Sequence, residues 1–433
     1  MIWNKEIECA SRADIREIQL RKLQETVKRC YDNVPFYQKK LDALNVKPED
    51  IKTLADAAKL PFTTKADFRD NYPYGLFAVP LKEVRRIHAS SGTTGKPIVG
   101  GYTKNDINSW AECIARIAAA AGVTDEDIAQ ISFGYGLFTG ALGLHFGLDR
   151  LGAMVIPISS GNSEKQLMMM KDLGTTLLVS TPSYAIYLSE VAQKLGYTKE
   201  DFKLRVGMFG GEGHTEEMRK LIEERWGILV TENYGLTEVG GPGVSGECYM
   251  KCGQHINEDF FLCEIIDPDT GEVLPYGEKG EMVITTLSKE AMPILRYRTR
   301  DITRLIDEPC KCGRTSLRME KIQGRSDDML IIKGVNVFPS QVETVLLTIP
   351  GVGPHYQLVV TRNSSFADVL EVRVELTDES LLDNFTALEQ LNASVRAKLK
   401  TVLGIDAKVT LVNPQTIERT AGKAKHVIDM RNK

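Results

Sequence analysis

A short segment rich in glycine and hydroxyl groups near residue 90 is the part of this sequence best suited to bind an anion. It reads Ser90, Ser91, Gly92, Thr93, Thr94, Gly95 and Lys96. Glycines let backbone N–H groups turn toward a phosphate, while hydroxyl groups and a lysine add donors and positive charge. The segment is not a Walker A loop, because its two glycines are too close together and Pro97 follows the lysine. We predict a phosphate-binding loop, with a polar hairpin turn as the alternative.

A second candidate segment directly follows an apolar run that predicts a strand. It consists of Tyr234, Gly235, Leu236, Thr237 and Glu238. Open α/β sheets bind ligands at the carboxyl ends of their strands. An aromatic ring there can stack on a base, and a carboxylate beside a hydroxyl group can hold Mg²⁺ against phosphates. Taken alone, the segment is more typical of a tight turn with a solvated glutamate.

Two further segments carry concentrated charge. Asp301 lies among Arg296, Arg298 and Arg300, a surround that favours an ionised carboxylate able to accept hydrogen bonds from a ribose. By itself this segment is more typical of an exposed, salt-bridged strand. Residues 419–425 combine small residues with lysines, a pattern that most often marks a solvated basic terminus.

Four of the eight cysteines lie near a histidine in a pattern that suggests a metal site. Cys248 and Cys252 precede His255, and Cys310 and Cys312 follow further along the chain. In a cytosolic protein such a cluster favours a metal over a disulfide. Tetrahedral Zn²⁺ takes four of these five ligands and leaves no position for water, so the site would be structural. Reduced thiols without a metal are the alternative.

The composition describes an ordinary globular chain. Of its 433 residues, 42% are hydrophobic and 26% are charged, and the formal net charge is −4. This balance gives no broad cationic field for nucleic acid or an anionic membrane. The amino-terminal residues lack the apolar core of a secretion signal, and no stretch is long and apolar enough to span a membrane. We therefore expect a cytoplasmic protein without nucleic-acid or membrane partners.

The elements that must position these residues change character along the chain. The first eighty residues show helical periodicity, and residues 85–103 predict two strands around the glycine-rich turn. Residues 106–234 alternate helix and strand patterns, which predicts parallel strands covered by helices. Antiparallel β-structure is expected after residue 240, and a small α+β unit from residue 330. We predict domains over residues 1–325 and 326–433, with the polar residues 324–328 as the hinge.

The order of these segments resembles the core motifs of the adenylate-forming superfamily of acyl- and aryl-CoA synthetases, peptide-synthetase adenylation domains and luciferases. Residues 63–67, 135–140, 234–238, 297–301 and 324–339 are more narrowly similar to the phenylacetate–CoA ligases, over nearly the whole chain. This resemblance implies an α/β fold, with a large N-terminal domain of parallel α/β sheets plus a β-rich segment and a small mobile C-terminal α+β domain.

The resemblance also implies a two-step reaction. A carboxylate attacks the α-phosphate of Mg²⁺-bound ATP to give an acyl adenylate and pyrophosphate, and coenzyme A then displaces AMP to form a thioester. Because negative charge develops on phosphoryl oxygens, positioning and cations would supply most of the catalysis. The substrate would be an aryl carboxylic acid like phenylacetate, and a place in phenylacetate catabolism and a homodimer are expected.

By motif position, the resemblance assigns roles to the candidate residues. Residues Ser90 to Lys96 would hold the departing phosphates, Thr237 would lie near the α-phosphate, and Glu238 would bind Mg²⁺. The remaining nucleotide-binding residues would be Tyr234 and Gly235 with Gly211 and Glu212 near adenine, and Asp301 and Arg325 at the ribose. The acyl pocket would be lined by Tyr135, Gly136, Phe138, Gly213 and His214.

The C-terminal residues would act in turn as the small domain rotates. Lys423 would reach the α-phosphate during adenylation, with Lys425 as the weaker candidate, Asp327 would be the hinge and Gly334 would face coenzyme A. Some relatives carry a Cys, a His and a Cys-x-Cys at the matching positions, so the resemblance implies Cys248, His255, Cys310 and Cys312 as zinc ligands, although Cys252 could replace Cys248.

Three questions stay open at this point. Residues 210–214 depart from the Gly-Ala-Glu-Pro-Trp common in phenylacetate enzymes, so the acid itself is not fixed. An adenylating enzyme that loads a carrier-protein thiol is the alternative within the same class. A zinc-dependent binding module is the alternative from a different class, and it would leave the four phosphate-competent segments unexplained.

Overall fold

The structure is a computed structural model. It describes residues 1–90, 97–325, 330–332, 335–363, 368–379, 381, 385–419 and 424–431, without the side chains of residues 325, 331 and 336. We call the elements up to residue 325 the large domain and those from residue 330 the small domain. The predicted boundary between residues 325 and 326 adjoins residues outside the described part, and it stays a prediction.

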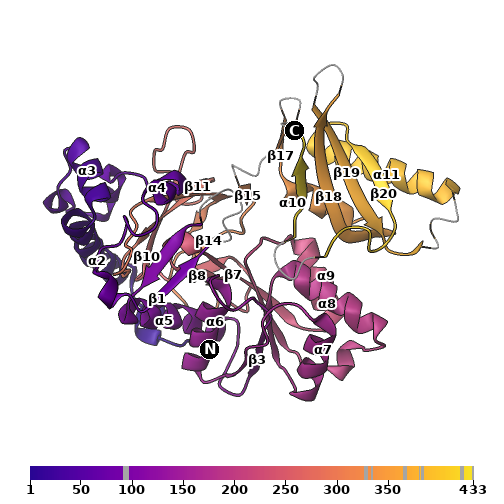
Figure 1. Ribbon diagram of the computed structural model, residues 1–433, viewed down its shortest axis with the longest axis horizontal. Coiled ribbons are helices and arrows are strands. Elements are labelled where there is room, and N and C mark those ends of the chain that lie inside the picture. Colours follow the sequence, from indigo (N-terminus) through magenta and orange to yellow (C-terminus); the bar gives the residue numbers. More distant parts are fainter. Residues whose placement is uncertain are drawn as a thin grey trace.

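After the short α1, the first helices of the large domain, α2 to α4, pack on the rest of the domain at one end of the molecule (Figure 1). The helices of this domain are α1 (Lys5–Glu8), α2 (Arg12–Asn33), α3 (Pro35–Ala43), α4 (Lys65–Asp70), α5 (Lys104–Ala120), α6 (Gly140–Leu151), α7 (Ser163–Asp172), α8 (Pro182–Lys194) and α9 (Glu216–Trp226), with short 3₁₀ helices η1 (Pro48–Asp50), η2 (Leu54–Lys59), η3 (Leu81–Glu83), η4 (Lys199–Asp201) and η5 (Thr237–Val239). The helical periodicity predicted for the first eighty residues is confirmed in α2, where Leu23, Val27 and Cys30 lie on one face and are completely buried.

A nine-stranded sheet forms the centre of the large domain. Its order is β13-β14-β9-β8-β7-β6-β5-β3-β4, made of β3 (Ile128–Ile131), β4 (Met154–Ile156), β5 (Leu177–Ser180), β6 (Val206–Phe209), β7 (Leu229–Leu236), β8 (Gly241–Glu247), β9 (Gln254–Ile256), β13 (Leu305–Ile306) and β14 (Arg318–Met319). Strands β3 to β7 pair in parallel, and pairing becomes antiparallel from β7 to β8. The predicted change near residue 240 is thus confirmed, and the end of β7 lies at the change.

Two smaller sheets complete the large domain. The hairpin of β1 (Arg86–Ala89) and β2 (Val99–Tyr102) brackets the glycine-rich segment, as predicted. A four-stranded antiparallel sheet contains β10 (Phe261–Ile266), β11 (Gly280–Thr286), β12 (Tyr297–Thr303) and β15 (Gly324–Arg325). Thr63 fixes the start of β12, because its N–H donates to the Arg296 carbonyl and its carbonyl accepts from the Arg298 N–H.

The small domain has a hydrophobic core of its own. It contains β16 (Leu330–Ile332), β17 (Val335–Val337), α10 (Pro339–Leu347), β18 (Val352–Arg362), β19 (Asp368–Leu376), α11 (Phe385–Leu403), β20 (Lys408–Val412) and β21 (Val427–Asp429). Its core is formed by buried residues of the small domain alone, most of them in these elements. The expected α+β unit is confirmed, and it contains two further short strands, β17 and β21, that were not anticipated.

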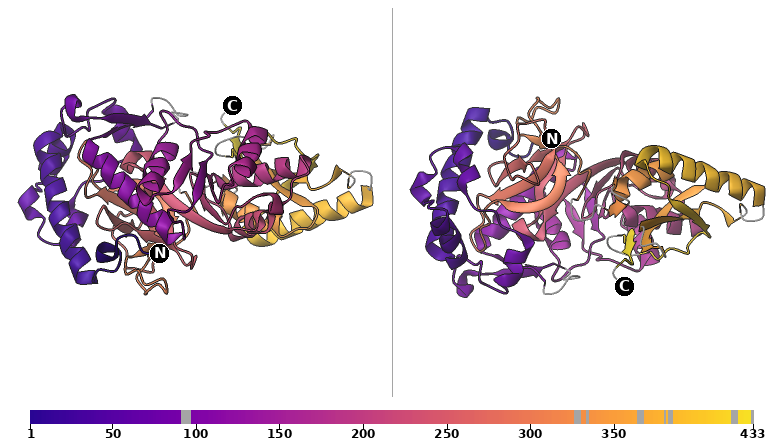
Figure 2. Two further views of the ribbon diagram at one scale, coloured as in Figure 1. Left: turned by 90° about the horizontal axis from the view of Figure 1, so that it is seen from below. Right: turned by 90° about the horizontal axis from the view of Figure 1, so that it is seen from above.

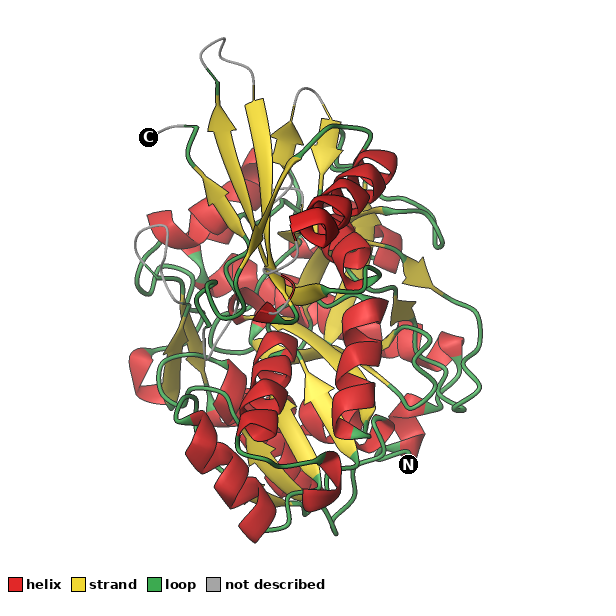
Figure 3. Ribbon diagram, turned by 90° about the vertical axis from the view of Figure 1, so that its right-hand side faces the viewer, coloured by secondary structure: helices red, strands yellow, loops and turns green. Residues whose placement is uncertain are grey.

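The small domain lies beside α8 and α9, and the views from below and above place it at the opposite end from the first helices (Figures 1 and 2). Helices lie against strands in both domains (Figure 3). Among the helices in the described ranges, none is long and apolar enough to cross a bilayer.

Candidate functional site

The predicted phosphate loop begins at the end of β1. Ser90 closes the base of the hairpin, because its N–H donates to the Ile98 carbonyl at 3.0 Å and its hydroxyl oxygen accepts from the Ile98 N–H at 3.0 Å. Residues 91–96 lie outside the described residues, so the predicted roles of Ser91, Gly92, Thr93, Thr94, Gly95 and Lys96 stay predictions.

The end of β7 turns sharply into η5 and carries the second predicted segment. A Cβ atom on Gly235 would lie 2.1 Å from the Gly241 carbonyl oxygen, so only glycine fits where β7 and β8 approach each other. Thr237 and Glu238 follow in η5, and both are buried at 8% exposure. The turn therefore buries Glu238 within the large domain. The alternative of a tight turn with a solvated glutamate is wrong.

Tyr234 of the nine-stranded sheet and Asp301 of the four-stranded sheet are in contact. The Tyr234 hydroxyl donates to Oδ2 of Asp301 at 2.6 Å, and both residues are buried. Burial, reinforced by the Asp301 charge, raises the pKa of Tyr234 well above its usual value, so the phenol stays protonated. Asp301 pairs in register with Arg325 of β15. Tyr234, predicted at the adenine, and Asp301, predicted at the ribose, are thus in contact, while the contacts of all the predicted nucleotide-binding residues with a nucleotide stay predictions.

The charged segment around Asp301 is a buried strand rather than an exposed one. Arg298 donates to both carboxylate oxygens of Glu281, which is completely buried on β11. Arg296 likewise pairs with Glu264. The expectation of an exposed strand is therefore wrong, but the expected salt bridges are present. The strand can be buried because these arginines are paired with carboxylates.

The predicted acyl-pocket segment lies beside the second segment. The Thr139 and Thr237 hydroxyl groups are 3.2 Å apart, and the Leu137 carbonyl accepts from the Ala89 N–H at 2.8 Å. Tyr135 hydrogen-bonds to Nδ1 of His145 at 3.1 Å, and burial raises the pKa of its phenol. Residues 135–139, which include Gly136 and Phe138, therefore connect the phosphate hairpin to the end of β7.

Glu212 adopts a role that its sequence context did not indicate. Its Oε1 accepts from the Ser183 N–H at 2.9 Å and from the Ser183 hydroxyl, and its Oε2 accepts from the Ala424 N–H at 2.9 Å. Gly211 before it has a positive φ of 83°, which glycine adopts without strain. The segment therefore connects β6 to the small domain, a contact between residues far apart in sequence that no local pattern could reveal.

His214 is buried, and neither of its ring nitrogens has a hydrogen-bond partner among the described residues. Burial, with the charges of Lys321 and Arg219, lowers its pKa well below the usual value. Lys321 lies before β15 and Arg219 lies on α9, so the groups that act on His214 do not belong to residues 135–139, the other part of the predicted acyl pocket. A Cβ atom on Gly213 would meet no atom within 4 Å. The acyl-pocket role of both residues stays a prediction.

Several predicted C-terminal residues fall outside the described residues, namely Asp327, Gly334 and Lys423. Ala424, which follows Lys423, contacts Glu212 as described above, and Lys425 is exposed.

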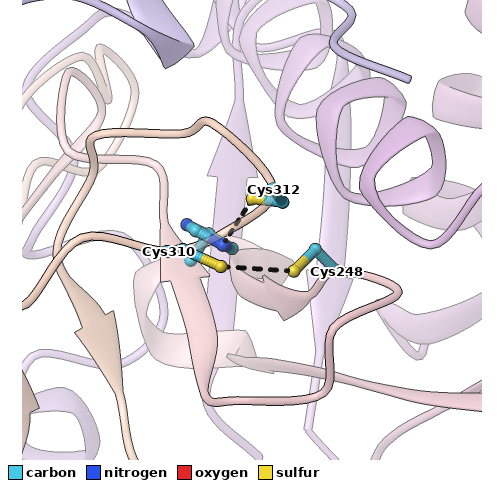
Figure 4. A group of neighbouring side chains, drawn as sticks. Cys248, Cys310 and Cys312 are labelled. Atoms are coloured by element: carbon cyan, nitrogen blue, oxygen red, sulfur yellow. Dashed lines mark hydrogen bonds between the residues drawn. The ribbon is translucent and has the colours of Figure 1, made fainter.

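Four of the predicted metal ligands converge in the large domain. The ligand atoms of Cys248, His255, Cys310 and Cys312 all lie within 4.8 Å of one another. Figure 4 shows Cys248 and Cys310 pointing at each other, with sulfurs 3.8 Å apart, and Cys312 on the same cluster. Nε2 of His255 lies 3.4 Å from the Cys312 sulfur, and its Nδ1 lies 3.0 Å from the Ser316 hydroxyl. Cys252 is exposed, with its sulfur 3.5 Å from that of Cys310.

Family models match both domains. The model described as AMP-binding enzyme matches residues 19–288, and that described as AMP-binding enzyme C-terminal domain matches residues 334–431. Phenylacetate–coenzyme A ligases from Aromatoleum evansii and Escherichia coli are each 49% identical to this chain, covering 99% and 98% of it and 97% of each relative.

A solved structure of 2-hydroxyisobutyryl-CoA ligase in the postadenylation state, in complex with 2-HIB-AMP, matches with a TM-score of 0.94 at 30% identity, covering 99% of this chain and 92% of that one. With 2-HIB-AMP and CoA in the thioesterification state, the same ligase gives 0.74 at 30% identity, covering 100% and 93%. The arrangement of the two domains here is thus closer to the former. The 49% identity over nearly the whole chain and the two family models show that the chain belongs to the phenylacetate–CoA ligase family of adenylate-forming enzymes.

Proposed function

We propose that this protein joins an aryl carboxylic acid of the phenylacetate type to coenzyme A at the expense of ATP, with AMP and pyrophosphate as by-products. The observation that carries the proposal is the 49% identity to phenylacetate–coenzyme A ligases over 99% of the chain. The pairing of Tyr234 with Asp301 supports it, because it brings the two proposed nucleoside-binding residues to one place.

In the first step, a carboxylate oxygen of the acid attacks the α-phosphorus of ATP, and the bond to the bridging oxygen of pyrophosphate breaks. The chain's own contribution is to align these groups and to offset the negative charge. Asp301 accepts hydrogen bonds from the ribose, Tyr234 lies against adenine and fixes the Asp301 carboxylate, and Thr237 donates to the α-phosphate. Lys423 supplies the cation at the phosphoryl oxygens.

Mg²⁺ would be held by Glu238. A buried carboxylate in a tight turn suits this hard cation, whose chemistry at this place is to neutralise phosphate charge. In the second step, the thiol of coenzyme A attacks the acyl carbon, and AMP leaves with its phosphate oxygen. We assign the hinge for the accompanying domain rotation to Asp327 and the coenzyme A side to Gly334.

The acid is bound by the segment from Tyr135 to Phe138 together with Gly213 and His214. An aromatic wall suits an aryl ring.

We further propose that Cys248, His255, Cys310 and Cys312 bind a structural Zn²⁺. Three thiols and an imidazole are a common zinc donor set, and four atoms within 4.8 Å of one another match a tetrahedral site. The contact of His255 Nδ1 with Ser316 orients the ring so that Nε2 faces the thiols. The geometry favours Cys248 over the exposed Cys252 as the fourth ligand. The homodimer, the cytoplasmic location and the place in phenylacetate catabolism stay predictions.

The proposal is tested by incubating the protein with Mg²⁺, ATP, coenzyme A and a panel of aryl, indolyl and short aliphatic acids. We expect an aryl-CoA thioester and one equivalent of AMP for each thioester. If AMP is released with a carrier protein as acceptor but not with free coenzyme A, the carrier-loading alternative is correct. If no acid yields a thioester on either acceptor, the proposal fails. The binding-module alternative is already excluded by the family of enzymes to which the chain belongs.

A further inference from the structure

The face of the large domain that meets the small domain carries two half-buried carboxylates, and each accepts a hydrogen bond from the small domain. Glu190 lies on α8 and accepts from Nε2 of His355 on β18 at 2.8 Å. Nη2 of Arg419 lies 3.7 Å from the same carboxylate. Glu212 accepts from the Ala424 N–H at 2.9 Å. His355, Arg419 and Ala424 all belong to the small domain.

Helix α8 holds both carboxylates in place. Ser183 in its first turn binds Oε1 of Glu212 through its N–H, and Glu190 lies seven residues later. Residues seven positions apart lie on the same face of a helix, two turns or about 10 Å from each other. One face of α8 therefore presents two anionic contact points to the small domain.

The contacts on the small domain fall on both sides of the predicted catalytic lysine in the sequence. Arg419 precedes Lys423 by four positions, and Ala424 follows it directly. Arg419 is itself fixed within the small domain, because it donates to both oxygens of Glu375 at 2.8 and 2.7 Å. A shift of the small domain that separates Arg419 from Glu190 would therefore move a rigid unit and not a loose side chain.

The charge around Glu190 favours its ionised form. Burial alone would raise the pKa of this carboxyl, but His355, Arg419 and Arg225 outweigh it and the pKa is lowered. A partly buried carboxylate with a charge-assisted hydrogen bond is a stronger contact than an exposed surface pair. Its loss would thus weaken one domain arrangement selectively, because the partners belong to different domains.

We propose that Glu190 and Glu212 are positioning residues that hold the small domain in the arrangement used for adenylation. In this arrangement the chain immediately before and after residues 420–423 is attached to the large domain. The proposal rests on the proposed ligase function. It adds that the contacts held by α8 set the fraction of molecules in the domain arrangement used for the first half-reaction.

The test compares the two half-reactions in Glu190→Gln, which removes the charge and keeps the shape. The first is measured as acid-dependent exchange of labelled pyrophosphate into ATP, and the second as thioester formation from supplied acyl adenylate and coenzyme A. We expect exchange to fall about tenfold, as for the loss of one partly buried charged contact. Thioester formation should stay within twofold of wild type.

Two further variants separate positioning from general damage. Glu371→Gln removes a carboxylate whose partners, Arg373, Lys408 and Thr410, all belong to the small domain. We expect both half-reactions of this control to stay within twofold of wild type. The double variant Glu190→Gln with His355→Gln should lose less exchange than the product of the two single losses, because the two residues share one contact.

The proposal is overturned if Glu190→Gln leaves exchange within twofold of wild type, or if both half-reactions fall by the same factor. These outcomes differ from a failure of the proposed function, in which the wild-type protein itself shows no acid-dependent exchange.

Discussion

At the residue scale, Lys289 has surroundings that disfavour its own charge. Its side chain is 8% exposed, and its Nζ lies 3.2 Å from the centre of the Tyr102 ring and 3.9 Å from Asp106. The Asp106 carboxylate already accepts from three backbone N–H groups. Burial therefore lowers the pKa of Lys289 to about 8, with Asp106 acting in the opposite direction.

This lowered pKa predicts how Lys289→Met changes stability with pH. Below pH 8 the lysine is charged in both states, and the folded state carries the full cost of burying the cation. Between pH 8 and the ordinary value of 10.5 the unfolded chain binds more protons, so wild-type stability rises with pH relative to the variant. We expect Lys289→Met to be more stable by about 1 to 3 kcal/mol at pH 7, because each pKa unit is worth ~1.4 kcal/mol.

Urea unfolding at pH 7 and pH 10 measures this difference, and Lys82→Met at an exposed position is the matched control. The advantage of the Lys289 variant should shrink at pH 10, while the control should follow wild type at both values. An equal or greater advantage at pH 10 would contradict the account.

Residue types were predictable from sequence here, but their partners were not. The segment 234–238 indicated an aromatic and a carboxylate at the end of a strand, which the structure confirms. The hydrogen bond from Tyr234 to Asp301 joins residues 67 positions apart on different sheets. Local spacing contains no information on such a contact, because it depends on how the sheets pack.

At the scale of elements, the cysteine cluster joins the loops at one edge of the central sheet, whose strands β8, β9, β14 and β13 are already paired with one another. Cys248 follows β8, His255 lies on β9, and Cys310 and Cys312 lie between β13 and β14. Arg314, next to this cluster, donates to the Glu8 carboxylate and to the Met1 carbonyl, so the cluster also reaches the amino terminus. A metal here would fix the antiparallel half of the central sheet and the first helix together.

Removal of zinc should therefore destabilise the folded protein, although none of the zinc ligands is a catalytic residue. We expect about one zinc per chain by elemental analysis of protein purified without chelator. Treatment with a strong chelator should lower the melting temperature by several degrees, as should Cys310→Ser, whereas Cys252→Ser should retain the metal. A zinc content near zero in the untreated protein would refute the site, and zinc loss in Cys252→Ser would refute the ligand choice.

The elements were well predicted wherever the pattern was local. The alternation of helices and strands expected over residues 106–234 is present as helices α5 to α9 with strands β4 to β7, and the α+β unit expected from residue 330 is the small domain. Strand β3 was missed, because buried Gln130 interrupts its apolar run while hydrogen-bonding to Gln166. The burial of β12 was missed as well, since its arginines signal exposure unless Glu281 on the neighbouring strand is known to pair with them.

At the scale of the whole molecule, the arrangement of the two domains resembles one state of a solved ligase more than another. The TM-scores of 0.94 and 0.74 against two states of one ligase describe an arrangement nearer to the postadenylation state. The solved ligase adopts both arrangements with one sequence, so sequence alone does not select between them. Contacts between residues far apart in the chain, such as that of Glu212 with Ala424, show the arrangement present here.

The hinge assignment predicts that Asp327→Pro separates the two steps. Proline fixes one backbone angle, so it opposes rotation without touching the reacting groups. We expect pyrophosphate exchange within twofold of wild type and thioester formation reduced at least tenfold, with Asp327→Ala close to wild type in both. Equal losses in both steps would place the hinge elsewhere.

The central claim is that the residues around the end of β7 activate a carboxylic acid with ATP before coenzyme A takes part. Exchange of labelled pyrophosphate into ATP, measured with an aryl acid and without coenzyme A, tests this claim most directly. We expect exchange that requires the acid and Mg²⁺ and falls at least a hundredfold in Glu238→Gln, as for the loss of a group that stabilises transition-state charge. Exchange that is absent with every acid, or that persists undiminished in Glu238→Gln, would contradict the account.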